Sequence, residues 1–563
     1  VKINTEPANQ ALLKALGAST GNARIAIVEA LGDARYQKAS QNLASLVNQS
    51  DPNLVKMTLY SLAYIADPAS ESVLAACAEK AGFRYDNTNA VDSYLIYANQ
   101  LLQKGNKTLA AKIAQNVWTK SSTDDLVNAR IAALKVMVEA TENNQELLLT
   151  AATDPNAQYR KAALKFAMPF VKDDNTSAWI KTMNKANDEV KADIIYMLGQ
   201  VPAPNALAAV VKQYKSNNPQ VKLAAIDASV NIGQEKVLPA LLKLMKNGDS
   251  TTIHAVSNAV KRMKGTGITG QVAAAIPSAK PASQIALLNL LGARAANAQL
   301  QEVYDQLKNK NPEVKQAAYS TLSDVVTSNN LPQLFTLLNE STGAEEIAVQ
   351  KAIISAVSGN SGDQTAITQT VLQQMNNTPE PKKQLFYKVL ASLGGDQSLA
   401  AVTSAYRSGN ESAQQAAVEA LASWKDASAA AALIGIARET KNASFLDIAL
   451  KGYLKQIRES KDTPEQKLLL LRNAMEVAQT TAQKQQILKD IQQSKCFNAI
   501  VFAGKYLDDA ALQQEAAQAV MNITLAGEYN GDLVKNLLNK TIAVMTAPDR
   551  GYQKEGIRKY IAR

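Results

Sequence analysis

The chain has 563 residues, of which 46% are hydrophobic and 5% aromatic, and its 60 basic and 50 acidic residues give a net charge of +10. This hydrophobic content excludes disorder over the whole chain, and the interspersed charges favour solubility over a nucleic-acid footprint. The two cysteines, Cys77 and Cys496, provide neither a disulfide framework nor a CxxC metal or redox site. No run approaches the roughly 18 to 20 apolar residues that a membrane helix needs, so no membrane span is expected.

Residues 1–82 form the first segment with regular helix signals. Asp51 followed by Pro52 is typical of a helix start, because the aspartate can cap the first turn and proline suits the first helical position. Gly17 and Gly32 each follow a leucine at a position where a helix is expected to end. We therefore expect short paired helices here.

Residues 83–122 depart from this pattern, and we expect an irregular helical segment. Four aromatic residues are concentrated here in a chain that is poor in them: Tyr85, Tyr94, Tyr97 and Trp118. Such side chains could stack on a sugar or a peptide, since aromatic rings combine a large contact area with a polar tip. Packing in the core is the alternative interpretation.

Residues 123–450 carry the clearest repeat. The similar stretches 218–225 and 311–318, with helix starts between them, place successive starts at positions 219, 250, 281 and 312, a step of about 31 residues. This step lies in the range of two-helix repeats. The same position in successive repeats is alanine, and a small side chain there would let helices approach closely; these alanines are Ala224, Ala255, Ala286 and Ala317. One repeat earlier, Asp193 stands in the alanine position.

An Asp-Pro or Asn-Pro turn, a Val-Lys pair and an Ala-Ala-x-x-x-Leu helix together resemble the HEAT repeat family, including its bacterial phycobilisome-lyase-like members. The resemblance extends over residues 21–80 and 123–439. It implies an all-α fold: an α-α superhelix, or armadillo-like solenoid, of stacked antiparallel helix pairs of about 31 residues.

Residues 451–563 contain longer and more charged helices, which resemble tetratricopeptide pairs as much as HEAT units. A last helix opens at Gly551 and the chain then stops within a repeat, so we expect a further domain to follow. The run 552–561 looks similar to a seam in large secreted Bacteroidetes proteins, which place HEAT arrays before a jelly-roll domain of the 3-keto-disaccharide hydrolase type. That resemblance implies a periplasmic, cell-surface or secreted location.

No catalytic, cofactor or metal site is expected within these residues. His254 is the only histidine, which excludes a histidine metal cluster and paired histidine acid–base chemistry. The stretch 265–270 matches the dinucleotide fingerprint GxGxxG, but it follows a helix rather than a strand, so we interpret it as a turn. The carboxylate pairs at 124–125 and 173–174 are interpreted as helix starts or turns.

Four lysines recur at one position of the repeat: Lys56, Lys191, Lys222 and Lys315. Stacked units would align them along one face. Either each lysine pairs with an acidic or capping group of a neighbouring unit, or the row lines a groove for an acidic polymer or partner. We keep these lysines and the four aromatic residues of 83–122 as candidate partner-binding residues.

Taken together, the sequence predicts a non-catalytic solenoid scaffold that binds a protein partner or a neighbouring domain along its concave face. The alternative is the N-terminal positioning arm of a larger exported carbohydrate-processing hydrolase, whose catalytic jelly-roll domain lies outside this chain. In that case a glycan would be bound through the linked domain. Neither interpretation involves a nucleic acid or a cofactor.

Overall fold

The computed structural model describes residues 4–359, 363–546 and 550–562, and within these ranges the chain is helical with connecting turns and no strand. The few residues at the ends of the expected first and last segments, 1–3 and 563, lie outside the described residues. The chain divides into two compact units, Val1–Ala286 and Leu287–Arg563, which are called the N-terminal and C-terminal units. Among the described residues, no helix combines the length and the apolar character that crossing a membrane requires.

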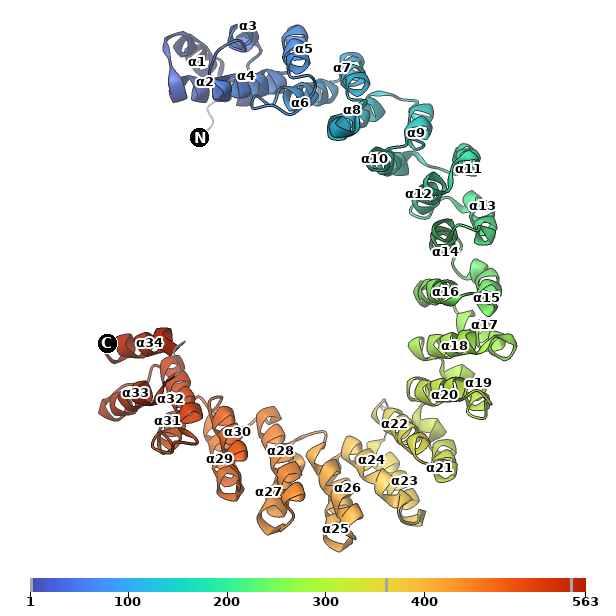
Figure 1. The fold of residues 1–563 in the computed structure, drawn as a ribbon, viewed down its shortest axis with the longest axis vertical. Helices are drawn as coiled ribbons and strands as arrows, with labels where there is room; N and C mark the ends of the chain where they lie inside the picture. The colour runs from blue at the N-terminus through green and yellow to red at the C-terminus, as the bar shows by residue number, and fades with distance from the viewer. Residues whose placement is uncertain (1–3, 360–362, 547–549, 563) are drawn as a thin grey trace. The chain divides into compact units, whose positions relative to one another are not determined.

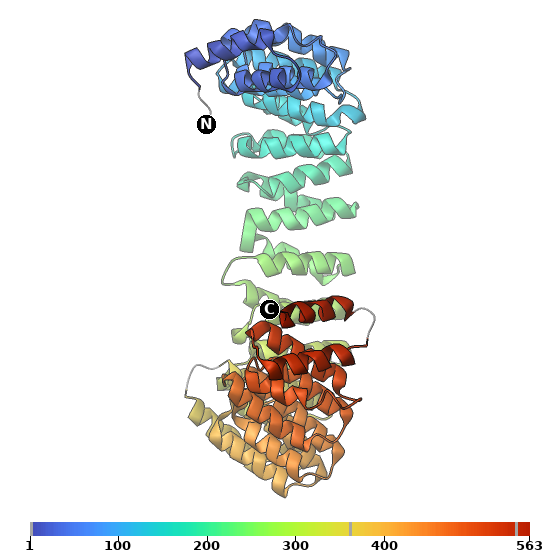
Figure 2. The same cartoon turned by 90° about the vertical axis from the view of Figure 1, so that its left-hand side faces the viewer.

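The N-terminal unit consists of two layers of helices (Figure 1). The even-numbered helices pack against one another in succession and form one layer, called the even layer, on the inner side of the curve that this unit traces. Its members are α2 (Gly21–Asp33), α4 (Pro52–Ile65), α6 (Ala90–Gln103), α8 (Val127–Ala140), α10 (Ala157–Ala167), α12 (Asp188–Leu198), α14 (Pro219–Gly233) and α16 (Ser250–Arg262). Figure 2 shows helices of this unit stacked like rungs.

The odd-numbered helices form the second layer, called the odd layer, and those from α1 to α15 each pack on the even-numbered helix that follows. In the N-terminal unit they are α1 (Glu6–Ala18), α3 (Ser40–Ala44), α5 (Glu71–Lys80), α7 (Lys107–Lys120), α9 (Gln145–Ala151), α11 (Thr176–Lys185), α13 (Leu207–Lys212), α15 (Leu238–Lys246) and α17 (Ile268–Ala275). Short 3₁₀ turns precede several of them, such as Pro68–Ser70 before α5 and Pro204–Ala206 before α13. The boundary between the two units lies within α18 (Pro281–Ala293).

The C-terminal unit repeats the same two-layer arrangement. Its even layer comprises α20 (Pro312–Val325), α22 (Ala344–Ser358), α24 (Leu385–Leu393), α26 (Glu411–Ala422), α28 (Ala443–Glu459), α30 (Thr481–Ile491), α32 (Gln513–Gly527) and α34 (Gly551–Ile561). Its odd layer comprises α19 (Leu300–Gln306), α21 (Leu331–Glu340), α23 (Gln364–Asn377), α25 (Gly395–Ser408), α27 (Ala430–Glu439), α29 (Pro464–Val477), α31 (Phe497–Gly504) and α33 (Asp532–Val544). Each unit is a solenoid of stacked helix pairs, so the predicted fold class is confirmed.

The predicted helix starts are confirmed at the capping residues. Asn218 Oδ1 accepts hydrogen bonds from the backbone N–H groups of Gln220 and Val221, at 2.9 and 3.3 Å. Asn311 caps α20 in the same way. These bonds satisfy donors that a helix start leaves without an intrahelical partner, and the following proline has no N–H to satisfy. These two even-layer helices therefore begin at the residues that the sequence predicted.

The expected irregular segment 83–122 is helical throughout most of its length, because it contains α6 and α7, each of 14 residues. These helices occupy the even and odd layers like those of the regular repeats. The segment boundaries expected at residues 82, 122 and 450 stay a prediction.

Small residues set the distance between neighbouring even-layer helices. A methyl group added to Gly199, at the end of α12, would lie 2.7 Å from the Cα atom of Ala228 in α14. The recurrent alanine lies one turn before this contact, and Ala224 is half-buried rather than enclosed. The close approach of α12 and α14 is thus made by Gly199 and Ala228, and Ala228 lies four residues beyond the recurrent alanine.

We predict that Gly199→Ala destabilises the chain, because the added methyl group overlaps backbone atoms of the next even-layer helix. Overpacking of this kind costs about 1 to 3 kcal/mol of the free energy of unfolding. The matched control is Gly17→Ala in α1, where an added methyl group meets nothing within 4 Å, and replacing a helical glycine there should raise stability by up to about 1 kcal/mol. Urea unfolding of both variants measures the difference; equal midpoints would contradict the predicted overlap.

Candidate functional site

A groove of about 840 Å³ opens on the even layer of the N-terminal unit, where α2, α4, α6 and α8 lie side by side. We call it the N-terminal groove. Its floor is formed by half-buried and buried apolar side chains, which are Ile25, Met57, Ile96 and Val136, one from each of the four helices. An apolar floor of this size offers surface whose removal from water would favour binding.

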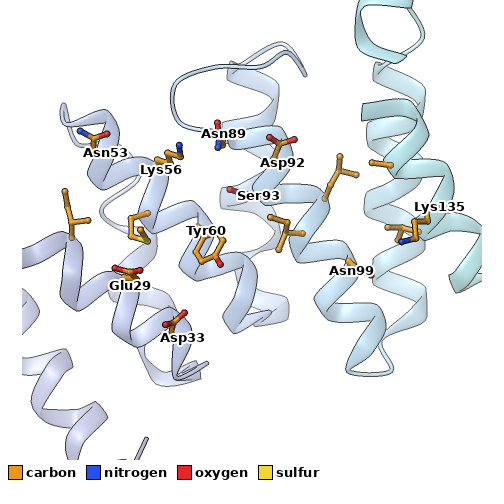
Figure 3. A pocket seen from close by; sticks show the side chains of 16 residues that line it. Glu29, Asp33, Asn53, Lys56, Tyr60, Asn89, Asp92, Ser93, Asn99 and Lys135 are labelled. Carbon is orange, nitrogen blue, oxygen red and sulfur yellow. The ribbon is translucent and has the colours of Figure 1, made fainter. Parts of the chain in front are cut away.

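Charged and polar side chains surround the floor (Figure 3). Glu29 and Asp33 lie one turn apart on α2, and Asp92 lies at the start of α6; all three are exposed. Lys56 on α4 is exposed and makes no ion pair with any residue of the described ranges. Lys135 on α8 is exposed and lies 4.0 Å from Glu139 in a weak ion pair. The rim therefore presents charges of both signs to solvent.

Tyr60 lies on the α4 wall of the groove, with its ring centroid 4.5 Å from that of Tyr64. The pKa of Tyr60 is raised to about 12, first by a hydrogen bond with Tyr64, then by burial, and then by the carboxylates of Asp33 and Glu29. The neutral phenol is therefore kept as a hydrogen-bonding group at the groove wall over the physiological range.

The structure places the four recurring lysines in different surroundings. Lys56 lines the N-terminal groove, whereas Lys191 lies 3.8 Å from Asp188 in its own helix. Lys222 faces the start of α16, where hydrogen bonds from Thr252 and, to a smaller extent, the Lys222 ammonium lower the pKa of Asp249. The lysines thus occupy the same position in their repeats, but each has different neighbouring side chains.

Lys315, in the C-terminal unit, pairs with Glu345 of the next even-layer helix at 2.6 Å. Its ammonium also lies 6.0 Å from the ring centroid of Tyr319. Lys315 and Tyr319 line a smaller cavity of about 450 Å³ with residues of α19 and α21. Lys315 therefore fits the interpretation in which a lysine of the row pairs with an acidic group of the neighbouring repeat.

The four aromatic residues of segment 83–122 do not form one surface. Tyr94 and Tyr97 are fully enclosed in the core and donate hydrogen bonds to Glu71 Oε1, at 3.1 Å, and to the Asp67 carbonyl oxygen, at 2.8 Å. Their phenols satisfy internal acceptors, so these two rings stabilise the stack of repeats. Tyr85, by contrast, is 81% exposed in the loop before α6.

Trp118 is half-buried and donates its indole N–H to the Tyr159 hydroxyl at 2.5 Å. The guanidinium of Arg130 lies between these two rings, 5.3 Å from the Trp118 centroid and 3.9 Å from that of Tyr159. Arg130 also pairs with Asp154 at 2.6 Å. Trp118 thus belongs to a cation–π cluster that joins successive repeats.

A buried arginine is the polar feature that the sequence analysis missed. Arg160 on α10 is 1% exposed, and its guanidinium donates to Glu189 Oε1 at 2.6 Å and to Asp193 Oδ2 at 2.8 Å, both on α12. It also donates to the Asp154 carbonyl oxygen at 2.8 Å. The signal in the sequence was Asp193, which stands where later repeats have alanine.

The other chemistry-bearing residues do not converge on one site. His254 is exposed on α16, and the stretch 265–270 covers the connection from α16 into α17. Asp124 accepts a hydrogen bond from the Asn156 amide at 2.6 Å, and Asp125 pairs with Arg84. Within the described residues, no group of three or more His, Cys, Asp or Glu side chains is arranged to hold a metal ion.

Comparison with known proteins supports the repeat type. A family model described as HEAT repeats matches residues 176–260, which cover α11 to α16. No curated protein sequence matches the chain.

Solved structures with a similar arrangement include Kap121p bound to Nup53p, at 13% identity over 98% of this chain and 71% of that chain, with a TM-score of 0.39. Importin beta in a polyethylene glycol condition matches at 12% identity over 98% and 81% of the two chains, with a TM-score of 0.36. Kap121p bound to RanGTP matches at 16% identity, with a TM-score of 0.35. That match covers 93% of this chain but only 56% of the Kap121p chain.

We predict that Arg160→Met destabilises the chain, because Glu189 and Asp193 would face each other without the cation between them. The loss of the hydrogen bonds that Arg160 makes to charged groups costs about 1.5 to 3 kcal/mol, and the lower end of this range applies to Glu189, which is 62% exposed. The control is Lys191→Met, which removes a more exposed pair and should change the free energy of unfolding by no more than about 1 kcal/mol. Thermal or urea unfolding measures both; a loss for Arg160→Met no larger than that of the control would contradict the assigned role.

We predict that Tyr64→Phe lowers the pKa of Tyr60 from about 12 toward the ordinary value of about 10, because the hydrogen bond that the Tyr60 phenol donates to Tyr64 is the largest cause of the raised value. A raised phenol pKa favours the folded state below pH 10, and this contribution is lost as the pH rises from about 10 to about 12. Ultraviolet titration of the phenolate, with Tyr60→Phe as the reference that identifies the signal, measures the shift. An unchanged titration in Tyr64→Phe would show that burial and the carboxylates hold the pKa instead.

Proposed function

We propose that this chain is a non-catalytic HEAT-repeat scaffold that binds a protein partner along the even layer of its N-terminal unit. The observation that carries the proposal is the N-terminal groove, a cavity of about 840 Å³ with an apolar floor on four successive helices. Its charged rim, with Lys56 free of ion pairs within the described part of the chain, can select the partner and its orientation.

The dimensions of the groove suit a protein segment. Neighbouring packed helices lie about 8 to 10 Å apart, so four of them span about 25 to 30 Å. A helix of about 20 residues has this length. The apolar face of such a helix would pack on Ile25, Met57 and Ile96, and its polar flanks would contact the charged rim.

A covalently linked domain is the second kind of partner that the sequence predicts. The location outside the cytoplasm and the role as positioning arm of a jelly-roll hydrolase rest on the resemblance of the C-terminal run alone, and they stay predictions. The reading frame of the native gene checks them. A glycan would enter this scheme only through such a domain.

We predict that a photo-crosslinking residue in the N-terminal groove captures a protein in the native host. Benzoylphenylalanine replaces Asn99, which lines the groove, and in the control it replaces Lys112, which is exposed on α7 of the odd layer. Protein adducts should form at position 99 and not at position 112. Ile96→Asp, in the floor of the groove, should lower the yield about tenfold, because a centrally placed contact contributes about 1.4 kcal/mol to binding. Lys56→Glu, at the rim, should lower the yield by a smaller factor, because a rim charge acts mainly on orientation and association.

Two further controls make this experiment decisive. Leu469→Asp introduces the same charge at an exposed leucine, 58% exposed on α29 of the C-terminal unit, and should leave the adduct unchanged. Far-ultraviolet circular dichroism verifies that every variant is folded. Equal adducts at positions 99 and 112, or adducts that ignore both groove variants, would contradict the proposed function.

A further inference from the structure

A second groove of about 800 Å³ lies on the same layer of the N-terminal unit, over α10, α12 and α14. We call it the basic groove. Its apolar lining includes Leu164, Met168, Met197 and Ala224. Tyr196 also lines the groove, and its side chain is 56% exposed to solvent. Tyrosine and methionine are enriched at protein interfaces, because an amphipathic ring and a flexible thioether adapt to a partner.

In this groove the carboxylates have ion-pair partners and the lysines do not. Its two carboxylates, Glu189 and Asp193, both accept hydrogen bonds from the buried Arg160. Its two lysines, Lys161 and Lys165, lie one turn apart on α10, are exposed, and have no ion-pair partner within the described ranges. Arg160, which lies beneath the groove, and the two lysines carry three positive charges against two negative ones, so the net charge is +1.

We propose that the basic groove binds an acidic amphipathic helix of a protein partner. Two carboxylates one turn apart on such a helix match the spacing of Lys161 and Lys165. Its apolar side chains would lie on Met168, Ala224 and Tyr196, which are partly or fully exposed. This inference deepens the proposed function, because it assigns a chemical class of partner to a second part of the same protein-binding layer.

The lining favours a protein over a nucleic acid. A single-stranded nucleic acid needs several aromatic rings on which successive bases stack, along a continuous basic track. The basic groove offers one exposed ring, Tyr196, and apolar side chains beneath it.

The test is a selection of random 16-residue peptides displayed on phage against the full chain. Lys161→Glu/Lys165→Glu is selected in parallel, and Lys181→Glu/Lys185→Glu is the matched control. The control lysines have the same spacing and are exposed, but they lie on α11 of the odd layer. The wild-type chain and the control should enrich peptides with acidic residues three or four apart beside Leu, Met or Phe.

The selected acidic peptides should bind the Lys161→Glu/Lys165→Glu variant at least tenfold more weakly in fluorescence polarisation, and raising the salt from low to physiological concentration should weaken wild-type binding. That variant should enrich basic peptides instead. Enrichment of the same peptides by both double variants, or tighter competition by a DNA or RNA oligonucleotide than by the peptides, would overturn the inference. Peptides that lose binding in Ile96→Asp but not in Lys161→Glu/Lys165→Glu would overturn it while leaving the proposed function intact.

Discussion

The close contact of each even-layer helix with the next is the constraint on which the rest of the structure depends. Three such contacts are built from small residues about 30 positions apart, in both units: Gly32 with Ser61, Gly199 with Ala228, and Gly452 with Ala422. No repeat can bury its apolar face alone, so each needs a neighbour at this short distance. Even a methyl group added at these glycines would meet atoms of the neighbouring helix within 2.7 Å and would push the two helices apart.

Polar links follow the same period and compete with binding for the charged side chains. Ion pairs join successive repeats at Arg160 and Asp193, Lys315 and Glu345, Lys388 and Glu419, and Arg458 and Asp490. A charge that bridges two repeats is satisfied internally and offers little to a partner. Among the lysines that line the two grooves, Lys56, Lys161 and Lys165 make no ion pair within the described residues and are available to a partner.

The sequence predicted the helix pairs and their starts because capping residues and proline act locally. Asn218 and Asn311 cap the helices that their sequence context indicated. The surroundings of each side chain were not predictable in the same way, because a small rotation between repeats decides whether a residue faces a groove or a neighbour. Lys56 and Lys315 share a repeat position, yet one lines a groove and the other pairs with Glu345. The burial of Tyr94 likewise depends on Glu71, 23 residues away.

The two grooves differ in the balance of their charges. In the N-terminal groove, Glu29, Asp33 and Asp92 outnumber Lys56 and Lys135, whereas Arg160 offsets the carboxylates of the basic groove. Both lie on one layer of one compact unit, so a partner with two suitable helices could occupy both at once. The second helix would then bind at the high effective concentration set by its linker, and two weak contacts would give one tight complex. Under the proposed function, specificity would come from the order of charges along the even layer.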